Sequence, residues 1–214
     1  PLYRGRPQAE RVTYLHANTF YELGDYYSAG YQFERFVKSF PQSTKREEAA
    51  FKSAESYYKR SPRFNLDQGD TYIALEKLQG FINEYPDSEQ LDEANAKVQE
   101  LRTKLERKAY EIAKGYNKIG ASRLTFPNAI SAFDNFLLDY PGSIYREDAL
   151  YWKFNSAYQL AMGSVKRRQV ERLKAAKAAY NALEKYYPQG KYADEAAKEL
   201  AEINEALQAN DLLN

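Results

Sequence analysis

The sequence of 214 residues contains no cysteine, a single histidine (His16) and no long apolar run. Without cysteine there is neither a disulfide nor a thiol nucleophile, and one histidine alone cannot form a usual zinc site. β-Branched residues are sparse, which disfavours strands, and no apolar run approaches the ~20 residues that span a bilayer. Lys and Arg number 31 against 30 Asp and Glu, so the net charge of +1 does not favour nucleic-acid binding.

One motif, an aromatic residue followed by proline, occurs four times, and its prolines are Pro41, Pro86, Pro141 and Pro188. Counted from each proline, alanine stands at −12 and +8, a large apolar residue at −8 and −5, and an acid at both +6 and +7. The upstream offsets form one stripe of a helix, and proline ends that helix. The pattern therefore predicts an all-α chain of repeated helix–turn–helix units.

The residues around each proline predict how the helices begin and end. Ser43, Ser88 and Ser143 are expected to cap the following helices, whose first turns hold the paired acids at the positive end of the helix dipole. Upstream, Gly24-Asp25 and Gly69-Asp70 are expected to be helix–helix turns, with glycine ending one helix and aspartate capping the next.

Helices are expected over residues 7–23, 25–39, 44–59, 70–84, 88–119, 128–139, 144–162, 168–186 and 191–208. Inserted loops are expected at 60–69 and 120–127, and fraying from Asn210 to Asn214. The segment 88–119 has no proline and keeps apolar residues at helical spacing, so it predicts one long helix. We therefore divide the solenoid into N-terminal repeats (1–87), a linking helix (88–119) and C-terminal repeats (120–214).

The spacing of Gly, Asp, Ala, aromatic and Pro resembles the tetratricopeptide repeat, whose unit is ~34 residues. Here the prolines lie 45, 55 and 47 residues apart, so helices are lengthened or loops inserted. With its Tyr-Pro-x-Ser corners and long central helix, the chain from about Pro7 to Leu207 resembles the BamD family of outer-membrane β-barrel assembly. The resemblance rests on Tyr31–Ser43, Tyr72–Ser88, Asn128–Ser143 and Lys177–Gly190.

The resemblance implies a tetratricopeptide-like superhelical scaffold at the periplasmic face of the outer membrane. Such a protein docks on the periplasmic domains of an Omp85/BamA-type barrel protein, contacts other assembly-complex subunits, and helps recognise and insert unfolded outer-membrane proteins. The resemblance further implies attachment to the membrane only through a lipidated N-terminal cysteine, which would precede Pro1. An arginine that the family uses against the barrel is replaced here by Ala132, so that contact is not carried over.

Two other functions remain open. CpoB-like periplasmic coordinators of the Tol-Pal and cell-division machinery use nearly the same repeats, with shorter and more regular spacing. A hydrolase on a helical-repeat frame is the second alternative, although the sequence has no glycine-rich phosphate loop and no Gly-x-Ser-x-Gly motif. We therefore expect no enzyme, no catalytic or metal-binding residues, no cofactor and no nucleic-acid partner.

Tyrosine is abundant, with 20 in the chain, and several lie in the first two repeats. Because tyrosine gives a large contact area at low entropic cost, these residues are candidates for a groove that binds an extended, aromatic-rich peptide. Packing between helices is the alternative for the same residues. The candidates are Tyr14, Tyr21, Tyr26, Tyr27, Tyr57 and Tyr58.

Two further groups are candidates for partner binding. The loop carrying Arg60, Arg63 and Phe64 presents residue types common at interfaces, and packing against its own repeat is the alternative. In the C-terminal repeats, the half that the resemblance assigns to the barrel protein, the candidates are Tyr145, Arg146 and Trp152, although burial between helices is the favoured interpretation of Trp152. The basic run at Lys166–Arg168 is interpreted as a solvated loop or helix end, and a patch that binds phosphate or lipid is the alternative.

Overall fold

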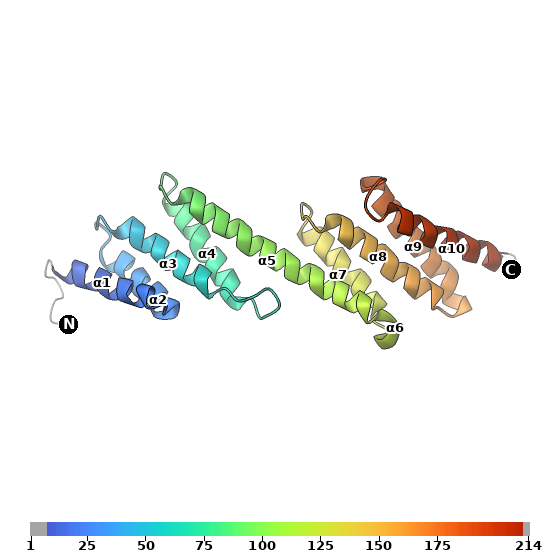
Figure 1. Cartoon of the computed structure of the whole chain (residues 1–214), viewed down its shortest axis with the longest axis horizontal. Coiled ribbons are helices and arrows are strands. Elements are labelled where there is room, and N and C mark those ends of the chain that lie inside the picture. The colour runs from blue at the N-terminus through green and yellow to red at the C-terminus, as the bar shows by residue number, and fades with distance from the viewer. Residues whose placement is uncertain (1–7, 212–214) are drawn as a thin grey trace. The chain divides into compact units, whose positions relative to one another are not determined.

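The computed structural model describes residues 8–211, and α-helix is the only regular secondary structure in that range. These residues form ten helices in sequence (Figure 1). Their bounds are α1 Gln8–Glu22, α2 Tyr26–Ser39, α3 Arg46–Arg60, α4 Gly69–Glu84, α5 Leu91–Lys118, α6 Gly120–Arg123, α7 Phe126–Asp139, α8 Arg146–Met162, α9 Lys166–Tyr186 and α10 Ala193–Asp211. The predicted all-α helical-repeat fold is confirmed, as is the single long helix.

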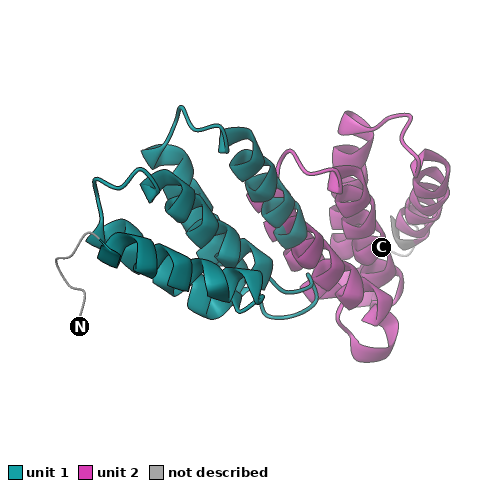
Figure 2. Cartoon of the chain, turned by 60° about the vertical axis from the view of Figure 1, so that its left-hand side comes forward, with its two compact units in different colours: residues 1–105 teal, residues 106–214 magenta. Residues whose placement is uncertain are grey.

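The chain divides into two compact units, residues 1–105 and residues 106–214 (Figure 2). Unit 1 contains α1 to α4 and the first half of α5, whereas unit 2 contains the second half of α5 and α6 to α10. Helix α5 is therefore shared, because its 28 residues run without interruption across the boundary.

Each repeat builds the same core, in which one helix is packed between two others. The sandwiched helices are α2, α4, α7 and α9, and each supplies the alanine at −12 and the apolar residue at −5 to a buried cluster. All four of these alanines, Ala29, Ala74, Ala129 and Ala176, have no exposed surface. A small side chain at this position lets the helix axes approach closely, so the spacing in the sequence predicted the core correctly.

The four corners share one backbone geometry. The aromatic residue before each proline has φ between −127° and −138° and ψ between 60° and 65°, because the proline ring excludes the α region for the residue that precedes it. Its N–H still donates to the carbonyl four residues back, and its C=O accepts from the residue three positions on. The proline thus occupies the second position of a β-turn, which its fixed φ favours.

The expected serine caps are wrong. Lys45 and Tyr145 occupy the N-cap positions of α3 and α8 and make no capping hydrogen bond through their side chains. The hydroxyl oxygens of Ser43 and Ser143 instead accept from the backbone N–H two residues on, at 3.0 and 3.2 Å, and Ser88 does the same at 3.1 Å. Each serine therefore closes a short turn before the helix begins.

Only the first of the two predicted Gly-Asp turns forms. Gly24 has a φ of +77° and ends α1, and the Asp25 carboxylate accepts from the N–H of Ser28 at 3.1 Å. The second expectation is wrong, because Gly69 is the first residue of α4 and the preceding cap position is Gln68. The Asp70 carboxylate pairs with Arg60 at 2.8 Å instead of capping the helix.

The loop predicted at 120–127 is also partly wrong. Residues 120–123 form the short helix α6, and α7 already begins at Phe126 with a proline in its first turn, where a missing N–H costs nothing. The reversal is tight, since a Cβ added at Gly120 would lie 2.2 Å from the Phe126 ring. Leu124 completes the reversal in the left-handed conformation (φ 57°, ψ 33°) with its side chain 82% exposed.

Candidate functional site

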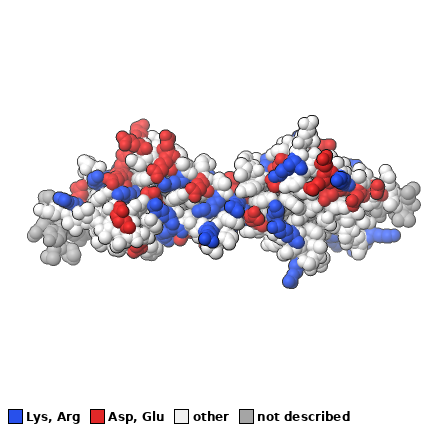
Figure 3. Space-filling view, viewed as in Figure 1, with Lys and Arg blue, Asp and Glu red and all other residues white. Residues whose placement is uncertain are grey.

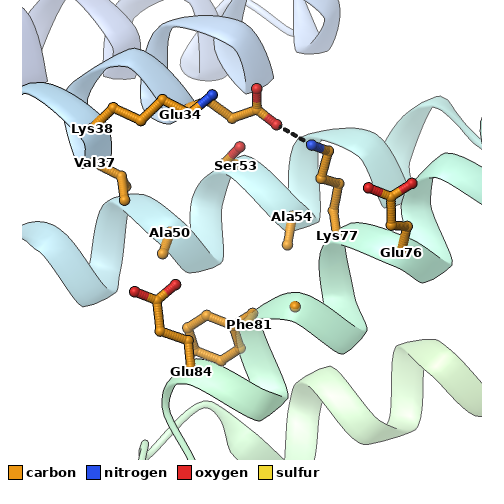
Figure 4. Close-up of a pocket in the computed structure, with 11 residues that line it drawn as sticks. Glu34, Val37, Lys38, Ala50, Ser53, Ala54, Glu76, Lys77, Phe81 and Glu84 are labelled. Carbon is orange, nitrogen blue, oxygen red and sulfur yellow. Dashed lines mark ion pairs between the residues drawn. The ribbon is translucent and has the colours of Figure 1, made fainter.

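A cleft of about 260 Å³ lies between α2 and α4 in unit 1, with α3 beneath it (Figure 4). Its floor is made of small side chains, Ala50, Ser53 and Ala54 from α3, beside the buried ring of Phe81. On α4, a Cβ added at Gly80 would meet no atom within 4 Å, so the cleft is open on that side. The absence of bulk at these positions is what leaves room for a ligand.

Charged side chains form the rim of the cleft. Lys77 on α4 and Glu34 on α2 form an ion pair at 2.6 Å (Figure 4), and the hydrogen bond to Glu34 raises the pKa of Lys77. Lys38, Glu76 and Glu84 complete the rim. Apolar contact at the floor with mixed charges above suits an extended peptide, because its side chains can be buried while its polar backbone groups stay near charged partners.

Three of the six candidate tyrosines connect neighbouring helices through their hydroxyls. Tyr14 donates to Glu48, Tyr21 to Glu55 at 2.5 Å and Tyr58 to Glu100 at 2.5 Å. Burial, followed by the hydrogen bond to Glu100, raises the pKa of Tyr58 to about 12. These hydroxyls are therefore engaged within the repeat stack.

Neighbouring side chains change the pKa of Glu48, the carboxylate that accepts from Tyr14. Burial alone would raise the pKa of Glu48, but hydrogen bonds from Lys45 and Tyr14 and the charge of Lys52 outweigh it and lower that pKa to about 2. The Lys52 ammonium lies 5.7 Å from the Tyr14 ring centre and 5.6 Å from that of Tyr21. Alternating ammonium groups, rings and carboxylates hold α1 against α3.

The other three tyrosines separate into two groups. The Tyr26 ring contacts Tyr21 edge to face, with ring centres 5.6 Å apart. Tyr27, 70% exposed, and the half-buried Tyr57 share the Arg60 guanidinium, which lies 4.8 and 5.4 Å from their ring centres. The six tyrosines therefore do not form one cluster, and none of them lines the cleft.

The loop after α3 is held by a buried glutamine. The Gln68 side chain, 3% exposed, donates to the carbonyls of Arg63 and Leu66 at 2.8 and 3.0 Å and accepts from Thr71 at 2.8 Å. The Arg63 side chain is exposed, whereas Phe64 is half-buried. The loop thus has a fixed backbone that presents Arg63 to solvent.

Two of the candidates in unit 2, Tyr145 and Arg146, lie at the corner between α7 and α8, and Trp152 lies within α8. The Tyr145 ring stacks on Tyr110 with centres 4.8 Å apart, and the Arg146 guanidinium lies 4.9 Å from the Tyr186 ring centre. Trp152 is half-buried and packs edge to face on Tyr151 at 5.0 Å. Its indole N–H is buried with no hydrogen-bond partner. Trp152 packs against two buried clusters of unit 2.

Comparison with known protein families decides the identity of the stack. Residues 2–123 and 122–213 match the family YfiO, described as an outer membrane lipoprotein. The chain belongs to this family, the BamD family. A search of curated proteins found no match. The BamD resemblance and the tetratricopeptide-like fold are both confirmed, and members of this family are typically scaffold lipoproteins without enzymatic activity.

Two structural features are absent from residues 8–211 of this BamD-family chain. Within residues 8–211, no helix combines the length and apolar character needed to cross a bilayer. The same range holds no group of three His, Asp or Glu side chains placed to bind a metal ion. His16 is exposed on α1, with its ring edge to face on Phe20 at 4.9 Å.

One set of residues that connects repeats in this BamD-family chain was missed by reasoning from the sequence. Fourteen residues after three of the prolines stand Glu55, Glu100 and Glu202, and each accepts from a tyrosine on the preceding layer. At the fourth equivalent position, Asn155 accepts from Asn117 at 3.0 Å. The recurrence of Glu at +14 could have been noticed in the sequence. The tyrosine that donates to it could not, because the number of residues between the two differs from repeat to repeat.

Proposed function

We propose that this BamD-family chain is a periplasmic scaffold of the machinery that assembles β-barrels in the outer membrane. In this proposal it is held at the periplasmic face by a lipid, docks on the periplasmic domains of an Omp85/BamA-type barrel protein and helps recognise and insert unfolded barrel proteins. The family match along residues 2–213 carries the proposal. A stack of helical repeats supports it, because such stacks present extended surfaces for protein partners.

The cleft between α2 and α4 is the proposed site for an extended segment of an unfolded barrel protein. Ala50, Ala54 and Phe81 provide an apolar base, and the Lys77–Glu34 pair lies at the rim. Tyr27 and Tyr57, which share Arg60, would extend this contact along α2 and α3. In unit 2, Tyr145, Arg146 and Trp152 are proposed to contact the barrel component.

The assembly role is tested by co-purification. The full-length protein is isolated from detergent-solubilised membranes, and its partners are identified by mass spectrometry. We expect an Omp85-type barrel protein as the dominant partner. Recovery of Tol-Pal proteins in its place would support the coordinator function and contradict the proposal.

The cleft itself is tested by filling it. In Gly80→Leu the new side chain enters open space, and replacing glycine within a helix adds stability, so folding is preserved. We expect the affinity for a fluorescent peptide from the last strand of a barrel protein to fall at least about 10-fold, a loss of about 1.4 kcal/mol. Gly115→Leu is the matched control, because Gly115 is also a helical glycine with open space at its Cβ. Equal affinities for the two variants would exclude the cleft as the binding site.

A further inference from the structure

Two turns of unit 2 lie at the same end of its helix stack. Helices α7 and α8 are joined by a tight corner and pack against each other as an antiparallel pair, so the start of α7 lies beside the end of α8. Helix α6 and Leu124 come directly before α7, and residues 163–165 come directly after α8. Figure 1 shows α6 and the α8–α9 turn at the lower end of unit 2. We call this end the basic end.

The basic end concentrates positive charge. Residues 112–133 contain three cations and no acid, and residues 149–170 contain four cations and no acid. Five of these seven side chains are exposed, and no ion pair holds any of the five within residues 8–211. They are Lys118, Arg123, Lys166, Arg167 and Arg168. On the face shown in Figure 3, Lys and Arg alternate with Asp and Glu over most of the surface, apart from a group of acidic side chains at the upper edge of unit 1.

The acids closest to this end do not neutralise it. Glu171 follows the basic run on α9, but Arg172 and Lys174 lie one and three residues after it. Asp211 is the last residue of α10, the helix that packs on α9, and Glu205 lies six residues earlier on the same helix. The local charge thus remains strongly positive although the whole chain carries only +1.

The placement of the basic run is unfavourable for the helix that contains it. Helices α3, α5, α8 and α10 each begin with two acids in their first turn, which the helix dipole favours. Helix α9 begins instead with Lys166, Arg167 and Arg168 and has no acid in that turn. Three cations at the positive end of a dipole oppose helix stability, so the stability of the fold does not explain them.

Aliphatic side chains protrude among these cations. Leu124 is 82% exposed and Val165 is 70% exposed, and both lie in turns at the basic end. Leu124 is also the single non-glycine residue with positive φ in residues 8–211, a conformation that is strained for a residue with a Cβ. Ile119, 46% exposed, and Met162, 38% exposed, lie beside them along the chain.

Isolated aliphatic side chains surrounded by Lys and Arg are typical of a surface that rests on a bilayer, where the side chains enter the headgroup region and the cations meet anionic lipids. A protein interface would instead favour aromatic anchors in a packed centre with few charges. We propose that the basic end binds the surface of a membrane that contains anionic phospholipid. This contact goes beyond the scaffold function, and it departs from the expectations that a lipid anchor is the sole membrane contact and that Lys166–Arg168 is merely solvated.

The test uses the 214-residue chain without a lipid anchor, so that only its own surface can bind. Co-sedimentation is measured with vesicles of phosphatidylcholine and with vesicles that also contain phosphatidylglycerol. We expect binding to the anionic vesicles alone, and loss of binding at high salt because salt screens the attraction. Absence of binding to anionic vesicles at low salt, or equal binding to neutral vesicles, would overturn the proposal.

Two variants locate the contact. Charge reversal of Lys166, Arg167 and Arg168 to Glu should lower partitioning at least about 100-fold, since each cation near an anionic surface contributes about 1 kcal/mol. The control reverses three exposed cations elsewhere, Arg35, Arg102 and Lys185, with the same change in net charge. Equal losses for the two triple variants would overturn the assignment to the basic end.

The aliphatic side chains are tested with Leu124→Ser combined with Val165→Ser, which leaves the charge unchanged and alters only exposed positions. We expect partitioning to fall at least about 5-fold, because burial of each aliphatic group contributes to interfacial binding. Circular dichroism verifies that every variant keeps its helices. If this variant binds anionic vesicles as well as the unmodified chain does, the contact of Leu124 and Val165 with the headgroup region is refuted, and charge alone accounts for the binding.

Discussion

Glu199 on α10 makes the stability of unit 2 dependent on pH. One of its carboxylate oxygens accepts from the Asn155 amide at 2.6 Å, and the other is buried without a hydrogen-bond partner. Burial is the main cause that raises its pKa from 4.5 to about 7, Asn155 opposes the rise, and the charges of Glu195 and Glu202 add to it. The folded chain therefore favours the protonated form of this side chain.

The direction of the pH dependence follows from this shift. Between pH 4.5 and about 7 the folded state holds a proton that the unfolded state has lost, so the contribution of Glu199 to stability decreases as the pH rises through that range and changes no further above it. A shift of this size corresponds to about 3 kcal/mol at full strength. Because the carboxyl group is only partly buried, solvent screening reduces the value to about 1–2 kcal/mol.

Glu199→Gln removes the charge and keeps an oxygen for Asn155. We expect the melting temperature at pH 8 to rise by about 3–6 °C, as about 1–2 kcal/mol implies for a chain of this size. At pH 5 the difference should shrink to a small fraction, because Glu199 is then protonated in the folded state. Thermal unfolding is followed by circular dichroism at both pH values, with Glu205→Gln as the control at an exposed position of α10. A gain that is equal at the two pH values would refute the reasoning.

Three further predictions concern packing, backbone strain and the contacts between repeats, and each is measured by denaturant unfolding. Phe133→Ala should lower the free energy of unfolding by about 3–5 kcal/mol because the ring is fully buried. The control Leu138→Ala should lower it little, because Leu138 on the same helix is 79% exposed. Equal losses of stability in the two variants would contradict the packing argument. Leu124→Gly should stabilise the chain by about 1 kcal/mol by relieving the left-handed conformation, and a loss of stability would show that the side chain contributes more than the strain. Tyr21→Phe should cost about 1 kcal/mol because Glu55 loses its donor, whereas an unchanged midpoint would mean that water replaces the hydroxyl.

The core could be predicted from the sequence because its positions recur in a fixed register. Alanine at −12 and the apolar residue at −5 are buried in all four repeats, and the proline that ends each helix acts through its own covalent geometry. The prediction that the serines cap the following helices was wrong, because a serine two residues after the proline can bond either to the helix or to the turn that precedes it. The hydroxyl of Ser43 lies within reach of the N–H of Lys45, so it bonds there before the helix begins.

The cleft could not be predicted, because it depends on the spacing between α2 and α4. No motif marks Ala50 or Gly80, and their small size matters only where the two helices leave a gap above α3. For the tyrosines, the sequence did not reveal their hydrogen-bond partners. Their number suggested a groove, but Tyr14, Tyr21 and Tyr58 each have a carboxylate partner on another helix, 34 to 42 residues away in the sequence.

The shared helix α5 has a consequence for how the chain unfolds. Residues 91–105 of this helix are held by the core of unit 1, and residues 106–118 by that of unit 2. In a stack of repeats, stability is a sum of local terms and terms between neighbours. Because intrahelical hydrogen bonds cross the boundary between the units, melting of one unit leaves half of α5 to fray and removes support from the other half. We therefore expect the unfolding of one unit to destabilise the other more than it would if a flexible linker joined them.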